Sequence, residues 1–159
     1  MLIREEQVRI VRHFTASPEQ VFAAWTDAGR LVRWFAPANC ELAVLRCDPR
    51  LGGELVTSTS APGFPSCTCL ATFTEFDPPH RLAFSWSFCD ENGRAVTAAA
   101  AGRPEWPDKT VVTVKFKVVE GGTEMELSQT VSATLAEDTG AAPSWRMMFD
   151  RLAQELELS

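Results

Sequence analysis

The chain has 159 residues, a formal net charge of −6 and 45% hydrophobic residues, with a pI near 5.0. This length fits one domain, 1–159, which can bury a substantial core. Lys and Arg are scattered along the chain, so we expect neither nucleic acid nor an anionic membrane as a partner. The N-terminus is charged, unlike a signal peptide, and no apolar run approaches the ~18 residues of a membrane span. We therefore expect a cytoplasmic protein without membrane insertion.

Residues 7–14, QVRIVRHF, alternate and are rich in β-branched side chains, which predicts a strand. A capping box follows, with Ser17 at the N-cap, Pro18 at the first helical position and Gln20 at the third. It predicts a helix that Gly29 stops.

A second short helix is predicted up to Pro37. Neither helix reaches the ~12–15 residues that an isolated helix needs for marginal stability. Their aromatic side chains must therefore pack against something else, and we expect a sheet to provide that surface. These side chains are Phe22, Trp25, Trp34 and Phe35.

The middle of the chain predicts a run of strands, because apolar and polar residues alternate there. Strict alternation is typical of antiparallel sheets with one buried and one wet face. The strands are expected at 40–48, 53–60, 67–76, 81–89, 110–119 and 123–131. Residues 143–158 instead carry one apolar stripe at helical spacing, which predicts a long terminal helix. The fold class is α+β, with a single curved antiparallel sheet of six to seven strands and helices on its inner side.

The segment 90–109 is longer than the ~12–15 residues at which a loop becomes unusual. It contains Trp106 between two prolines. One interpretation is a partly ordered loop whose Trp packs on its own domain. The alternative is a lid over a pocket, or a subunit contact that would support a homodimer.

Five cysteines, an odd number without CxxC spacing, indicate free thiols as in cytosolic proteins. Cys67 and Cys69 would share one strand face and could contact a metal, but only two histidines are available to complete a site. We therefore expect buried thiols, no metal and no cofactor. No nucleophile elbow, phosphate-binding loop or dinucleotide motif is present.

Five pieces of the chain, taken in order and spacing, resemble the SRPBCC (START-like) superfamily. Within it they are most similar to the group named for the C-terminal domain of the activator of heat-shock protein 90 ATPase. The resemblance covers residues 6–157, except the 90–109 insert. The pieces are FTASPEQVFAAWTDAGRLVRWF, CDPRLGGEL, ATFTEFDPPHRLAFSW, TVVTVKFKVVEGGTEMELSQ and SWRMMFDRLAQEL.

The resemblance implies a helix-grip fold, in which a curved sheet wraps around the C-terminal helix and two short helices close one end. It also implies an apolar cavity between sheet and helix, in proteins that act as ligand binders, cyclases or co-chaperone domains. The chain departs from the pattern at Gln129, where many relatives carry His, and at Ser144-Trp145, where Gly-Trp is usual. Both departures weaken any transfer of acid–base chemistry.

The expected site follows from the phase of the strands and of the terminal helix. Inward residues could form solid core, or they could line a hollow that holds a ligand. The candidate ligand-binding residues are Trp34, Phe73, Glu75, Phe84, Trp86, Val114, Phe116, Met125, Gln129, Trp145, Met148 and Phe149. No catalytic residue is assigned.

Glu75 has two interpretations. It could face inward opposite Gln129 as a polar anchor or a general acid/base. It could instead bulge outward before the Pro-Pro turn and bind the backbone or an Arg, since acids are rarely fully buried.

Three functions follow. The leading hypothesis is a binding protein for a small apolar or amphipathic molecule, with a stress-related role suggested by the family name. The second is a cyclase or dehydratase that uses Glu75. The third is a co-chaperone of heat-shock protein 90; the absence of a further N-terminal domain argues against it.

Overall fold

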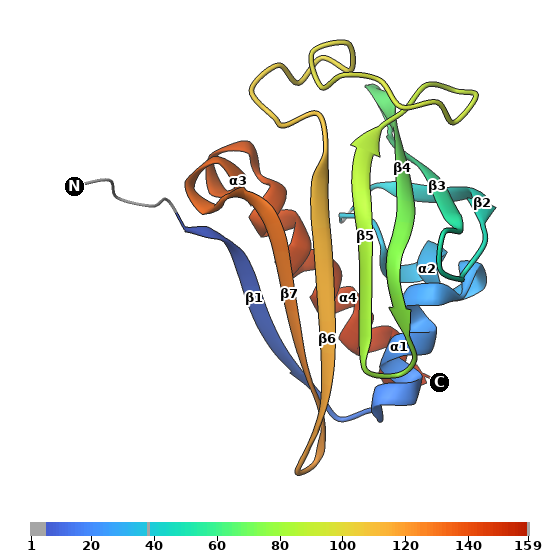
Figure 1. The fold of residues 1–159 in the computed structure, drawn as a ribbon, viewed down its shortest axis with the longest axis vertical. Coiled ribbons are helices and arrows are strands. Elements are labelled where there is room, and N and C mark those ends of the chain that lie inside the picture. Colours follow the sequence, from blue (N-terminus) through green and yellow to red (C-terminus); the bar gives the residue numbers. More distant parts are fainter. Residues whose placement is uncertain (1–5, 38, 159) are drawn as a thin grey trace.

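A computed structural model describes residues 6–37 and 39–158. The first five residues, part of the segment expected not to be a signal peptide, lie outside the described residues. The elements, in chain order (Figure 1), are β1 (Gln7–Phe14), α1 (Pro18–Thr26), α2 (Ala28–Trp34), β2 (Glu41–Cys47), β3 (Glu54–Ala61), β4 (Phe64–Asp77), β5 (Arg81–Phe88), β6 (Thr110–Val119), β7 (Gly122–Ser132), α3 (Ala133–Thr139) and α4 (Ala141–Leu158).

The strands form one seven-stranded sheet in the order β1-β7-β6-β5-β4-β3-β2, and every neighbouring pair is antiparallel. The first strand therefore lies beside the last strand, and the chain then continues into α3 and α4. Helices α1, α2 and α4 lie on one side of the curved sheet (Figure 1). The helix-grip fold predicted from the sequence is confirmed.

The capping box forms as predicted. The Ser17 hydroxyl accepts a hydrogen bond from the Gln20 backbone N–H, and the Gln20 side chain accepts one from the Ser17 N–H. The predicted end of the first helix at Gly29 is wrong. Helix α1 ends at Thr26, and Asp27 caps its end and also starts α2 by accepting from Gly29 N–H. Gly29 lies inside α2, because a capping carboxylate outweighs one glycine as a boundary signal.

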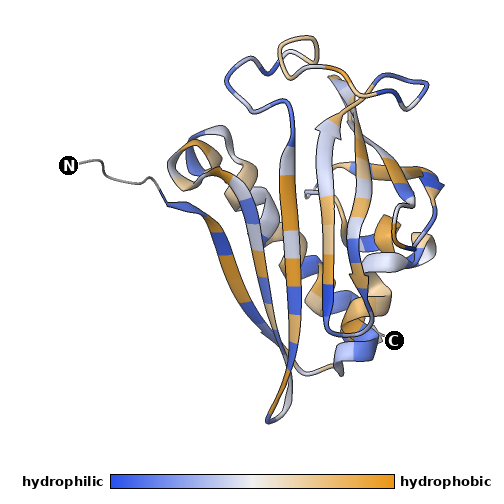
Figure 2. Ribbon diagram, in the orientation of Figure 1, coloured by the Kyte–Doolittle hydropathy of each residue, from blue (hydrophilic) through white to orange (hydrophobic). Residues whose placement is uncertain are grey.

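Helices and sheet bury their rings against one another. Trp25 lies at the centre of the aromatic cluster, with ring centroids 4.9 Å from Trp34, 6.4 Å from Phe84 and 6.2 Å from Trp145. Bands of hydrophobic and hydrophilic residues alternate along the strands in Figure 2, as a sheet with one buried face requires. The predicted packing of the short-helix rings against sheet and terminal helix is confirmed.

Strand β4 contains an irregularity next to Glu75, as one of the two interpretations of this residue required. Its pairing with β5 shifts register between Phe73 and Glu75. Phe73 and Phe76 are both turned to the core as a result, with ring centroids 5.6 Å apart. Glu75 lies outside and pairs with Arg81, with 47% of its side chain exposed. Of the two interpretations of Glu75, the outward bulge paired with an Arg is confirmed and the inward polar anchor is wrong, because a bulge reverses the alternation of every residue after it.

The insert between β5 and β6 carries no helix or strand, apart from one bridge between Cys89 and Ala95. It is held by hydrogen bonds of its own. Ala98 N–H donates to the Asp108 carboxylate at 2.8 Å, and Arg103 N–H donates to Ala98 O at 2.7 Å. These bonds fold residues 97–108 into a compact unit at one end of the sheet (Figure 1).

Candidate functional site

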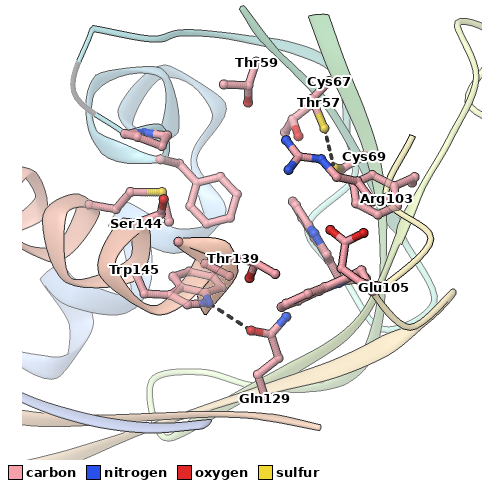
Figure 3. A pocket seen from close by; sticks show the side chains of 18 residues that line it. Thr57, Thr59, Cys67, Cys69, Arg103, Glu105, Gln129, Thr139, Ser144 and Trp145 are labelled. Carbon is pink, nitrogen blue, oxygen red and sulfur yellow. Dashed lines mark hydrogen bonds between the residues drawn. The ribbon is translucent and has the colours of Figure 1, made fainter. Parts of the chain in front are cut away.

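A pocket of about 280 Å³ lies between the start of α4, the concave face of the sheet and the 90–109 insert (Figure 3). Seven stretches of chain contribute to it, and its lining mixes aromatic rings with hydroxyl, thiol and charged groups. The lining residues are Phe35, Pro37, Thr57, Thr59, Cys67, Cys69, Trp86, Phe88, Arg103, Glu105, Trp106, Gln129, Thr139, Gly140, Ala141, Ser144, Trp145 and Met148.

Two hydrogen bonds between buried polar side chains hold one wall of the pocket together. The Trp145 indole N–H donates to Gln129 Oε1 at 3.0 Å, and Gln129 Nε2 donates to Thr110 Oγ1 at 3.1 Å. Both polar ends of Gln129 are therefore satisfied. These two hydrogen bonds connect α4 to β7 and β6, and they fix the Trp145 ring at the pocket wall.

The opposite wall carries two thiols. Cys67 and Cys69 point to the same face of β4, with their sulfurs 3.9 Å apart. The hydrogen bond from Cys69 lowers the pKa of Cys67 from 9.0 to about 7, against the effect of burial, and the nearby Arg103 charge adds to the lowering. The interaction with Cys67 and burial raise the pKa of Cys69. Cys67 therefore loses its proton more readily than an ordinary cysteine, and Cys69 loses its proton less readily.

The insert forms the rim. Arg103 and Glu105 are exposed residues that line the pocket, and both side chains extend into it in Figure 3. Trp106 is half-buried and packs against the aromatic core. The two interpretations of this Trp therefore combine, because it packs on its own domain and also covers part of a pocket.

The structure brings together only part of the predicted site. Trp86, Gln129, Trp145 and Met148 line the pocket. Seven others are buried core residues away from its lining: Trp34, Phe73, Phe84, Val114, Phe116, Met125 and Phe149. Glu75 lies on the surface. The alternation along a strand separates residues on the concave face from residues on the outer face. It does not show which residues of the concave face pack in the core and which line the pocket.

Most of the polar lining was not predicted from the sequence. Thr57, Thr59, Cys67, Cys69 and Phe88 share an inward phase with residues that were recognised. Arg103 and Glu105 had no such signal, because an irregular loop has no periodicity to follow. Only the length of the insert and its Trp pointed to this end of the sheet.

Among residues 6–37 and 39–158, no group of three or more His, Cys, Asp or Glu side chains is placed to hold a metal ion. No helix in the described part of the chain is long and apolar enough to cross a membrane.

A curved antiparallel sheet closed on a C-terminal helix, with a pocket at the end of the grip, defines the helix-grip class. The family model "Activator of Hsp90 ATPase homolog 1-like protein" (AHSA1) matches residues 15–157. The chain belongs to this family, within the SRPBCC superfamily. The family resemblance inferred from the sequence is confirmed.

Solved structures of bacterial proteins share the fold. An AHSA1 protein from Silicibacter pomeroyi matches with a TM-score of 0.76 at 20% identity, over 96% of this chain and 99% of that one. A protein from Staphylococcus epidermidis matches with a TM-score of 0.79 at 21% identity, over 99% and 94%. An AHSA1-like protein from Aeromonas hydrophila matches with a TM-score of 0.69 at 22% identity, over 96% and 93%. No curated protein matches the chain.

Proposed function

We propose that this protein binds a small amphipathic molecule in the pocket between α4, the sheet and the insert. The observation that carries the proposal is the lining itself. Rings of Phe35, Trp86 and Trp145 face a space of about 280 Å³, and polar groups converge on the same space. Such a mixture of apolar walls and a few placed polar groups is typical of small-molecule sites.

The volume limits the ligand. It lies near the lower end of the ~300–1,000 Å³ usual for ligand pockets, so it suits a compact ring system or a short chain rather than a large lipid. The apolar part would lie against Trp86, Trp145 and Met148. The polar part would face the rim, where Arg103 and Glu105 can reach it.

Native mass spectrometry of freshly purified protein is the first test. We expect a discrete extra mass that disappears on denaturation. The matched test uses Ser144→Phe, which fills the pocket from α4, beside Gln154→Phe on an exposed position of the same helix. Loss of the extra mass in the first variant only supports the proposal. If both variants keep the extra mass equally, the ligand lies elsewhere. The proposal is contradicted if the wild-type protein carries no extra mass and no member of a small-molecule panel raises its melting temperature.

The enzyme hypothesis based on Glu75 has no geometric support, since that carboxylate pairs with Arg81 away from the pocket. Stimulation of heat-shock protein 90 is suggested only by the family name. Mixing the two proteins and measuring ATP hydrolysis tests it, and we expect no stimulation. We likewise propose no role in nucleic acid binding, given the net negative charge.

A further inference from the structure

We propose that Cys67 is a nucleophilic thiol that captures electrophilic ligands of this pocket, of the α,β-unsaturated carbonyl class. The inference rests on the proposed binding function, because it takes the same pocket as the place where the electrophile sits. It adds a covalent step and names the chemical class of the ligand.

The geometry of three residues supports it. Cys67 lies in the pocket wall, half-buried, with the Cys69 sulfur 3.9 Å away and itself buried. The Arg103 side chain extends toward the thiols from the rim (Figure 3). A thiolate at Cys67 would therefore have a thiol donor on one side and a cation on the other, which is the kind of environment that makes a cysteine reactive.

The other cysteines lack this arrangement. Burial and the neighbouring carboxylates of Asp27 and Asp48 raise the pKa of Cys47. Burial and Asp90 raise the pKa of Cys89. Neither lines the pocket. Of Cys47, Cys67, Cys69 and Cys89, only Cys67 has a lowered pKa.

The reaction is a conjugate addition and needs no oxidant. The Cys67 thiolate attacks the β-carbon, forming a carbon–sulfur bond while the C=C electrons move onto the carbonyl oxygen. Arg103 stabilises that developing enolate charge. The α-carbon then takes a proton from water, which replaces the one that the thiol released. The product is a neutral thioether, with no leaving group.

The size of the effect can be bounded. At pH 7 a thiol with a pKa of about 7 is about half ionised, whereas one at 9.0 is about 1% ionised, a gain of about fiftyfold. The lower pKa reduces intrinsic nucleophilicity by about tenfold, since the Brønsted slope is ~0.4–0.5. The net preference for Cys67 is about fivefold from ionisation alone. Binding of an apolar electrophile in the pocket, next to the thiolate, would increase this preference for Cys67 further.

The test exposes the reduced, full-length protein to trans-2-octenal at pH 7, traps adducts by borohydride reduction and maps them by peptide mass spectrometry. Iodoacetamide serves as a small polar alkylator. We expect Cys67 to react at least about fivefold faster than Cys40 and Cys47 with either reagent, and with a larger ratio for octenal. Equal labelling of all three cysteines would overturn the proposal.

Two matched variants separate the causes. Arg103→Gln should slow octenal addition at Cys67, whereas Arg94→Gln, an exposed Arg of the same insert outside the pocket lining, should not. Cys69→Ala should slow both reagents at pH 7. Unchanged rates in Arg103→Gln and Cys69→Ala would show an ordinary exposed thiol and overturn the proposal. A bound mass in the native experiment without Cys67 selectivity would leave the proposed function standing and refute this inference alone.

Discussion

The indole N–H of Trp145 donates to Gln129 Oε1 at 3.0 Å, and this single bond joins the first turns of α4 to the C-terminal half of β7. Both side chains are almost fully buried. Gln129 also donates to Thr110, so removing its amide leaves two buried polar groups without partners.

Replacing Gln129 with Leu should therefore destabilise the protein by about 1–3 kcal/mol, the cost of an unsatisfied buried donor. Urea unfolding followed by fluorescence would measure it. Glu124→Gln, an exposed site on the same strand, should change the unfolding free energy by less than about 0.5 kcal/mol. Equal effects of the two changes would show that the bond to Trp145 contributes nothing specific.

Glu75→Gln tests the surface placement of this carboxylate. Because the ion pair with Arg81 is about half exposed on both sides, its loss should cost less than about 1 kcal/mol. Ligand retention in native mass spectrometry should be unchanged. If Glu75→Gln instead abolished binding or turnover, the carboxylate would have to reach the pocket, contrary to this structure.

Gly122 and Gly121 at the β6–β7 turn provide a matched pair. Both have positive φ, 148° and 82°, but a Cβ on Gly122 would lie 1.9 Å from Phe14 O, whereas one on Gly121 would contact nothing within 4 Å. Gly121→Ala should cost about 1 kcal/mol, the strain of the left-handed region. Gly122→Ala should cost clearly more, because β1 must move. Comparable melting temperatures for the two variants would contradict the close approach.

The rate of alkylation at Cys67 should rise with pH and level off above about 8, with a midpoint near 7. The sign follows from the thiolate being the reactive form: protonation below the pKa removes it. Arg103 and Glu105 are the charged residues that line the same pocket. Cys69→Ala should move the midpoint upward, because the hydrogen bond from Cys69 is the largest cause of the lowering. A midpoint near 9 in the wild type would refute this environment.

The order of strands and helices was predictable because each element shows its own period of apolar residues along the sequence. The strand at 81–89 and the terminal helix needed only their own alternation or stripe to be recognised. Helix α3 was missed, since its seven residues, Ala133–Thr139, are short and carry little apolar signal between β7 and Gly140. The predicted site failed where phase depended on a bulge, as at Glu75, or where core and pocket residues shared one face, as with Phe84 and Trp86.

The sequence by itself determined the class of fold, the family and the inward set of rings, because alternation, capping and helical spacing act over a few residues. Only the tertiary structure decided where the core ends and a pocket begins. That boundary depends on the register between β4 and β5, on the fold of the insert over the end of the sheet, and on α4 meeting Gln129. Each of these is a contact between separate elements or across an irregular loop, for which the pattern within one element carries no information.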